Sequence, residues 1–147
     1  MSETPIHLAL IESAASMGVE RRRRYLFEHG PHELGWSYTN ILDVGDRLLR
    51  QIVVRGFFRL FLYVSNGDGG VVSFWIRITG LTTYREPELF NDPVDGNRYL
   101  IHSRMMIGAI EPLEKPMPLE SFRSADRRKP DARHLELGFL FVVDPEP

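Results

Sequence analysis

The chain has 147 residues, of which 43% are apolar and 26% are charged, and its formal net charge is -2. This composition is typical of one globular domain and excludes intrinsic disorder, and no run of about eighteen apolar residues predicts a membrane span. The absence of cysteine excludes disulfides, thiolate zinc sites and cysteine nucleophiles, and it fits a cytoplasmic protein.

The first third of the chain predicts one helix and two elements of less definite type. Residues 6–11 are apolar and fit either a strand or the start of a helix. Residues 18–28 predict a helix that ends at the following Gly-Pro pair. Residues 43–46, with the sequence Asp-Val-Gly-Asp, predict a turn, and the apolar run at residues 48–54 predicts a strand after it.

A β-hairpin is the clearest element of the sequence. Residues 57–65 and 71–79 are rich in β-branched and aromatic side chains, and the Asn-Gly-Asp-Gly-Gly segment between them is a strong turn signal. Their alternation predicts one core face, made of Phe58, Leu60, Leu62, Val64, Val72, Phe74, Ile76 and Ile78.

The second face of the hairpin carries aromatic side chains together with arginine. If the five-residue turn contains no bulge, Ser65 faces Val71, Phe61 faces Trp75 and Arg59 faces Arg77. Opposed arginines are unfavourable unless a negative group from another segment or a bound anion lies between them, or solvent separates them. This face either binds bases and phosphate or forms a second layer of the core.

Two further strands are predicted, at residues 98–110 and 134–143. The three prolines of residues 112–118 indicate an extended connector, and residues 119–125 fit a short helix with Leu119 and Phe122 facing inward. Five or six strands with one or two helices predict a strand-dominated α+β domain over residues 1–147, built as a small, partly closed, mostly antiparallel β-barrel.

Several phrases resemble PUA-like domains of the EVE and ASCH type over about residues 36–143. They are Trp36, Val44-Gly45-Asp46-Arg47, Ile110-Glu111-Pro112-Leu113 and Lys115-Pro116-Met117-Pro118-Leu119. The N-terminal strand lacks the Trp and Lys-Ser-Glu-Pro phrase usual in EVE domains, and residues 48–59 look like an insertion. The resemblance implies a PUA-like barrel that binds RNA or DNA, in some members a modified base in an aromatic-lined pocket.

The predicted nucleic-acid surface combines aromatic and basic residues, namely Arg59, Phe61, Trp75, Arg77 and Arg104 with the basic loop of Arg127, Arg128 and Lys129. Trp36, Tyr38, Tyr84 and Tyr99 are the candidate lining of a base pocket, although Trp36 fits equally a plug at the barrel end. The alternatives are a small-molecule-binding or enzymatic barrel that uses His102 and Arg104, and an interaction or homodimer surface on the hairpin.

No motif for catalysis or cofactor binding is present. The sequence has no Gly-x-Ser-x-Gly elbow, Walker loop or dinucleotide fingerprint, so a non-enzymatic protein without cofactors is expected. His29 and His32 lie in a turn that cannot align them as helical metal ligands, which favours solvated loop histidines and predicts no metal site. Residues 21–24 are four arginines that wrap around a helix, a pattern that favours a solvated helix over phosphate contact.

Overall fold

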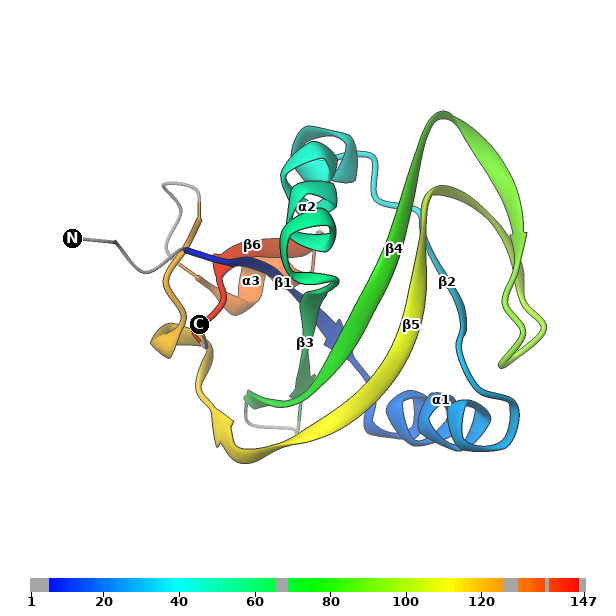
Figure 1. Cartoon of the computed structure of the whole chain (residues 1–147). Coiled ribbons are helices and arrows are strands. Elements are labelled where there is room, and N and C mark those ends of the chain that lie inside the picture. Colours follow the sequence, from blue (N-terminus) through cyan, green and yellow to red (C-terminus); the bar gives the residue numbers. More distant parts are fainter. Residues whose placement is uncertain (1–5, 66–68, 126–129, 137, 146–147) are drawn as a thin grey trace.

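The computed structural model describes residues 6–65, 69–125, 130–136 and 138–145 (Figure 1). In chain order the elements are β1 (Leu8–Ala14), α1 (Ser16–His29), β2 (His32–Trp36), α2 (Ile41–Arg55), β3 (Phe58–Ser65), β4 (Gly70–Asn91), β5 (Arg98–Met117), the 3-10 turn η1 (Leu119–Ser121), α3 (Ala132–Leu135) and β6 (Phe139–Val143). The predicted α+β, strand-dominated class is confirmed.

The strands form one mixed sheet in the order β2-β5-β4-β3-β1-β6. Only β1 and β3 run parallel, because α1, β2 and α2 separate them in the chain; the other neighbours are antiparallel. β4 and β5 form a hairpin far longer than the other pairs, and several register shifts bend it. No helix in the described ranges has both the length and the apolar composition needed to cross a membrane.

The described strands do not close into the predicted barrel. β2 and β6 are the two edge strands of the sheet, and each pairs with only one other strand; the free side of β6 is hydrogen-bonded instead to residues 123–125. Barrel closure needs the first and last strands to run side by side with a matched stagger, and β2 and β6 have only five residues each. The edges meet instead through side chains, since the rings of Trp36 and Phe139 stack with centroids 5.2 Å apart.

Both faces of the sheet are covered around β1, β3 and β6, which explains why Ala9, Leu10 and Ile11 are all buried. On one face, α1 and α2 contribute Val19, Ile41 and Leu48 to a core with the inward side chains of the sheet. On the other face, η1 and α3 cover a smaller core made of Ala9, Ile11, Phe61, Val72, Leu119, Phe122, Leu135, Leu140 and Val142.

The predicted strand at residues 48–54 is wrong, because these residues lie in α2. Ile41, Leu48 and Ile52 repeat at helical spacing and pack against the sheet. The predicted turn at residues 43–46 also lies within this helix. Gly45 serves packing there, since a Cβ at that position would lie 3.2 Å from Thr83 Cγ2. Its lack of a side chain therefore lets α2 approach β4 closely.

The remaining predictions differ mainly at element ends. The helix expected at residues 18–28 lies within α1, and the apolar segment at residues 6–11 leads into the strand β1, which begins at Leu8. The strand expected from residue 134 begins only at Phe139, because Asp131 accepts a hydrogen bond from the Arg133 backbone N–H and starts α3. The proline-rich connector is extended as predicted, within β5, and Leu119 and Phe122 face inward.

Candidate functional site

A pocket of about 190 Å³ lies where β1 ends and α1 begins. Its polar lining comes from Glu12, Ser13 and Arg22, and its apolar walls are Val19, Leu34, Leu62, Ile76 and Ile110. Pockets for drug-sized ligands measure roughly 300–1,000 Å³, so this volume suits a single small ring system.

Glu12 is the buried acid of the pocket. Its Oε2 accepts a hydrogen bond from Trp36 Nε1 (3.1 Å), and its Oε1 accepts one from the Tyr38 hydroxyl (3.3 Å). Glu12 keeps some exposed surface, but protein surrounds its carboxyl group. This burial raises the pKa of Glu12 to about 7, although the hydrogen bonds from Trp36 and Tyr38 and the charge of Arg22 act to lower it. Near neutral pH the group is therefore present both as a carboxylate, which only accepts hydrogen bonds, and as a carboxylic acid, which can donate one.

Trp36 and Tyr38 hold the Glu12 carboxyl through hydrogen bonds, and Phe139 packs against both of their rings. The Trp36 ring lies edge-on to Tyr38, with centroids 5.0 Å apart, and Phe139 is 6.0 Å from Tyr38. Burial, and then the nearby charge of Glu12, raise the pKa of Tyr38 to about 12, so its hydroxyl stays a neutral donor. The two predicted pocket aromatics, Trp36 and Tyr38, are thus brought together as supports of Glu12.

The other two predicted pocket aromatics, Tyr99 and Tyr84, lie elsewhere. The Tyr99 hydroxyl donates to the Gly35 carbonyl (3.0 Å), and burial raises the pKa of Tyr99 to about 12. The Tyr84 carbonyl lies 2.9 Å from Nδ1 of His102. Neither ring lines the pocket at Glu12.

Arg22 forms part of the pocket wall, and its guanidinium group is bound by residues outside the pocket. Its Nη2 pairs with Asp92 (2.7 Å), and its Nη1 donates to His32 Nε2 (3.3 Å), while His32 Nδ1 faces the Gly30 carbonyl (3.1 Å). Burial lowers the pKa of His32, so the imidazole accepts from Arg22 as a neutral ring. This network joins α1, β2 and the end of β4.

His29 and His32, the histidines considered as metal ligands, have partners within the protein. Tyr25 lies between His29 and His32, with ring centroids 4.4 and 4.7 Å away. Both ring nitrogens of His32 are already engaged. Within the described ranges, no three His, Asp or Glu side chains are grouped as metal ligands would be.

The hairpin has the predicted pairs, with Phe61 opposite Trp75 and Arg59 opposite Arg77. Ser65 pairs with Gly70 rather than Val71, and a register shift between Leu62 and Tyr63 restores the predicted pairing farther along.

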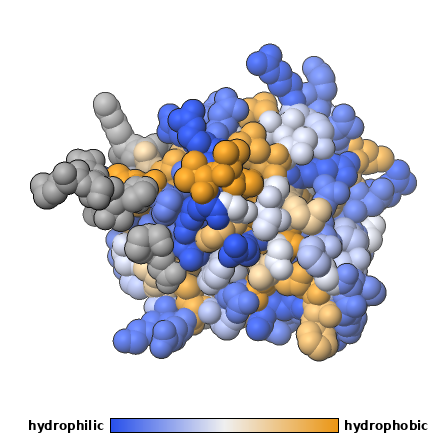
Figure 2. Space-filling model, in the orientation of Figure 1, coloured by the Kyte–Doolittle hydropathy of each residue, from blue (hydrophilic) through white to orange (hydrophobic). Residues whose placement is uncertain are grey.

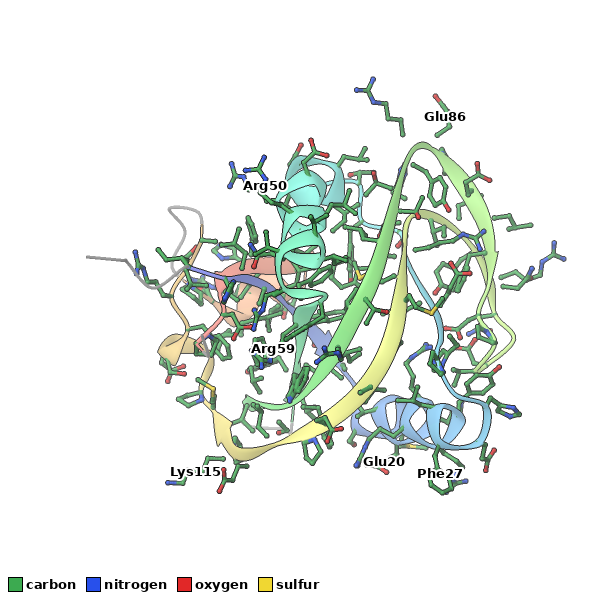
Figure 3. All side chains as sticks on the ribbon, in the orientation of Figure 1. Glu20, Phe27, Arg50, Arg59, Glu86 and Lys115 are labelled. Atoms are coloured by element: carbon green, nitrogen blue, oxygen red, sulfur yellow. The ribbon has the colours of Figure 1, made fainter. Side chains whose placement is uncertain are left out.

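Asp144 supplies the negative partner of Arg59 from another segment. Its Oδ2 lies 2.8 Å from Arg59 Nη1 and 3.2 Å from Arg55 Nη1, and its side chain has no exposed surface. The guanidinium groups of Arg77, Arg55 and Arg59 lie 3.9, 4.4 and 5.4 Å from the centre of the Phe57 ring. We call Arg55, Arg59, Arg77, Phe57 and Asp144 the arginine cluster; Figure 3 shows Arg59 near the C-terminal end of α2.

The other predicted surface residues do not form one face. Phe61 is 1% exposed and packs edge-on against Phe122, so its ring is not available for base stacking. Trp75 is partly exposed, with the Arg59 guanidinium 4.8 Å from its ring centre. Arg104 lies on the long hairpin, 3.9 Å from Glu33. Arg127, Arg128 and Lys129 lie outside the described residues.

Sequence reasoning missed Glu12 and Arg22. Glu12 ends an apolar run in β1, and a lone carboxyl in such a run is a usable signal of a buried acid. Arg22 was hidden within four consecutive arginines, of which it is the one that lines the pocket.

Comparison with known proteins adds no assignment to this site. No protein-family model matches the chain, and the search of curated proteins gives no match.

Proposed function

We propose that this protein is a non-enzymatic nucleic-acid-binding module that holds one base of RNA or DNA, including a modified base, in the Glu12 pocket. The observation that carries the proposal is a small pocket with apolar walls and a single buried carboxyl group, at the start of an arginine-rich helix.

The pocket suits the chemistry of a nucleobase. The Glu12 carboxylate can accept hydrogen bonds from the amino and ring N–H groups of a base edge, as carboxylates do with cytosine. The side chains of Val19, Leu34 and Ile110 offer apolar contact to the flat faces of a ring. Because a stacked base cannot enter such a pocket, the ligand is an unpaired or flipped nucleotide.

The arginines of α1 supply charge for phosphate. Arg21 and Arg24 are exposed, and neither has an ion-pair partner in the described part of the chain, whereas Arg23 pairs with Glu20 (3.3 Å). Glu20 and Phe27 project from the outer side of the same helix (Figure 3). Phosphate contact by Arg21 and Arg24 would make the affinity fall with rising salt, because counterions are released on binding.

A PUA-like assignment is part of the same proposal. A strand-dominated domain, with edge strands that meet through Trp36 and Phe139, supports a relation to partly closed barrels. The proposal moves the base site from the four predicted aromatics to Glu12, which two of those aromatics hold in place.

The test is fluorescence anisotropy with labelled single-stranded RNA and DNA over a series of salt concentrations. Glu12→Gln keeps the size of the side chain but removes the carboxylate, and we expect affinity to fall about tenfold, since a good base contact contributes about 1–3 kcal/mol. Glu120→Gln, an exposed site on η1, is the matched control and should bind like the wild type. Absence of binding at low salt, or full affinity in Glu12→Gln, would refute the proposal.

A double variant separates the two contributions. Arg21→Gln with Arg24→Gln should weaken binding to all sequences and reduce the slope of log affinity against log salt by about 1–2. Arg85→Gln with Arg98→Gln removes two exposed charges from the long hairpin and serves as the control. Equal slopes in the two double variants would exclude α1 as the phosphate-binding element.

A small-molecule-binding protein is the second candidate, because the pocket can take a free heterocycle without a phosphate chain. Calorimetry with free nucleosides distinguishes the two. Nucleoside binding as tight as that of the oligonucleotide, with no dependence on salt, would favour the second candidate.

A further inference from the structure

The outer face of α2 exposes an unusual amount of apolar surface. Val53 and Val54 are 83% and 68% exposed, and Leu42 and Leu49 are also exposed. Figure 2 shows hydrophobic surface gathered where α2 lies in Figure 1. Large apolar patches on an otherwise polar surface commonly mark contact sites.

These side chains have a helical arrangement. Leu42, Leu49 and Val53 recur at spacings of seven and four residues, so they form one stripe along α2, away from the buried residues Ile41 and Leu48. The exposed pair Asp46 and Arg50 lies beside this stripe, with Val54 beyond it. The face is therefore an apolar surface with a charged row along it.

The charges of this row are separated along the helix. Along α2, Asp43 and Asp46 precede Arg47 and Arg50. In the described ranges none of the four forms an ion pair, and Arg50 projects away from the body of the protein (Figure 3). An identical helix placed antiparallel brings Asp46 of each copy opposite Arg50 of the other.

We propose that two copies of this chain form a homodimer through an antiparallel α2–α2 contact. A two-fold axis near Leu48 places the apolar stripes of both helices together and forms two Asp46–Arg50 pairs, because each residue of a self-complementary interface meets its counterpart twice. Antiparallel pairing also sets the positive N-terminal end of one helix dipole beside the negative C-terminal end of the other.

The α2–α2 contact is short, so we expect weak association. α2 has 15 residues and is about 22 Å long, so the helix pair belongs to the small interfaces typical of weak association. The dimer should therefore form in a concentration-dependent manner. α1, which borders the Glu12 pocket, lies apart from α2 (Figure 1), so the proposed contact does not involve it.

Sedimentation velocity over a wide range of protein concentrations tests this proposal. The mass should rise from 17.0 kDa toward twice that value as concentration increases. Leu49→Glu should remain monomeric with an unchanged circular dichroism spectrum, because the residue is exposed. Leu89→Glu is the control on the long hairpin, where the side chain is also exposed, and it should dimerise like the wild type.

Charge reversal identifies the partner as a second copy. Asp46→Arg should weaken dimerisation at least tenfold, and Asp46→Arg combined with Arg50→Asp should restore it, because both pairs are then reversed. A wild-type mass of 17.0 kDa at every concentration would overturn the proposal and leave the face for another partner. Failure of the folded double variant to recover dimerisation would overturn the antiparallel register.

Discussion

Glu12 and Asp144 are both acids inside this protein, but their partners differ. Asp144 lies between two guanidinium groups, at 2.8 and 3.2 Å, and has no exposed side-chain surface. Glu12 accepts hydrogen bonds from two neutral donors and adjoins a pocket. Burial raises the pKa of Glu12 to about 7, because neutral donors do not offset the loss of solvation.

This difference separates a structural acid from a candidate binding acid. A carboxylate surrounded by cations has its interactions satisfied within the protein, and removing it leaves buried positive charge. A carboxyl group next to an open pocket can still accept or donate a hydrogen bond to a ligand. Mutations in the arginine cluster should therefore lower stability, whereas mutations of Glu12 should change ligand binding and the pH dependence of stability.

The largest effect is expected from Asp144→Asn, which leaves Arg55 and Arg59 without their shared carboxylate. The free energy of unfolding should fall by about 3–4 kcal/mol, as when one member of a buried ion pair is removed. Urea denaturation measures the change. Asp131→Asn, which removes an exposed pair with Arg133, is the control and should leave the unfolding midpoint unchanged. An equal loss in both variants would contradict a special structural role for Asp144.

A smaller and pH-dependent effect is expected from Glu12→Gln. Because the folded-state pKa of Glu12 is raised from 4.5 to about 7, the folded protein binds the proton more tightly than the unfolded chain does. The contribution of Glu12 to stability is therefore present at pH below about 4.5 and decreases as the pH rises to about 7. The total decrease is about 3 kcal/mol.

Unfolding of the wild type and Glu12→Gln at pH 5 and pH 8 tests this effect. The free-energy difference between the two proteins should change with pH in favour of Glu12→Gln at pH 8. The difference is used because His32 also titrates. Burial lowers the pKa of His32, so both proteins gain stability as the pH rises through the range where His32 titrates, and this gain cancels in the difference. Parallel pH profiles of the two proteins would show that Glu12 titrates normally.

The smallest of these effects is expected from Arg59→Gln, which leaves Arg55 paired with Asp144. We expect a loss of about 1–2 kcal/mol in the free energy of unfolding and no change in oligonucleotide affinity. Arg77→Gln is the comparison variant on the opposite strand. If the double variant of Arg59 and Arg77 kept its stability but lost affinity for oligonucleotide or phosphate, the pair would instead belong to an anion-binding site.

Local patterns were sufficient for the hairpin and α1. Strand alternation has a period of two, so the turn signal and the side-chain pattern predicted that Phe61 faces Trp75, and the register shift between Leu62 and Tyr63 corrects the one-residue difference near the turn. The helix at residues 18–28 was evident from its stop signal at Gly30. Both inferences use interactions between residues near in the chain.

Other features depend on contacts between distant segments. The exposed positions of the run from Leu48 to Val54 are apolar as well as the buried ones. This hides the helical period, and the run resembles a buried strand in sequence. Only packing against β4 selects the helix. The burial of Phe61 required η1 to cover the second face of the hairpin.

The sequence by itself determined the strand-dominated class, the Phe61–Trp75 and Arg59–Arg77 pairs of the hairpin and the position of α1. Tertiary structure alone decided the site, because Glu12 receives its hydrogen bonds from residues 24 and 26 positions later in the chain, and Arg22 is held by Asp92, 70 positions away. The pKa of a carboxyl group depends on the solvent it loses and the charges around it, and both are set by segments that meet only in the folded protein.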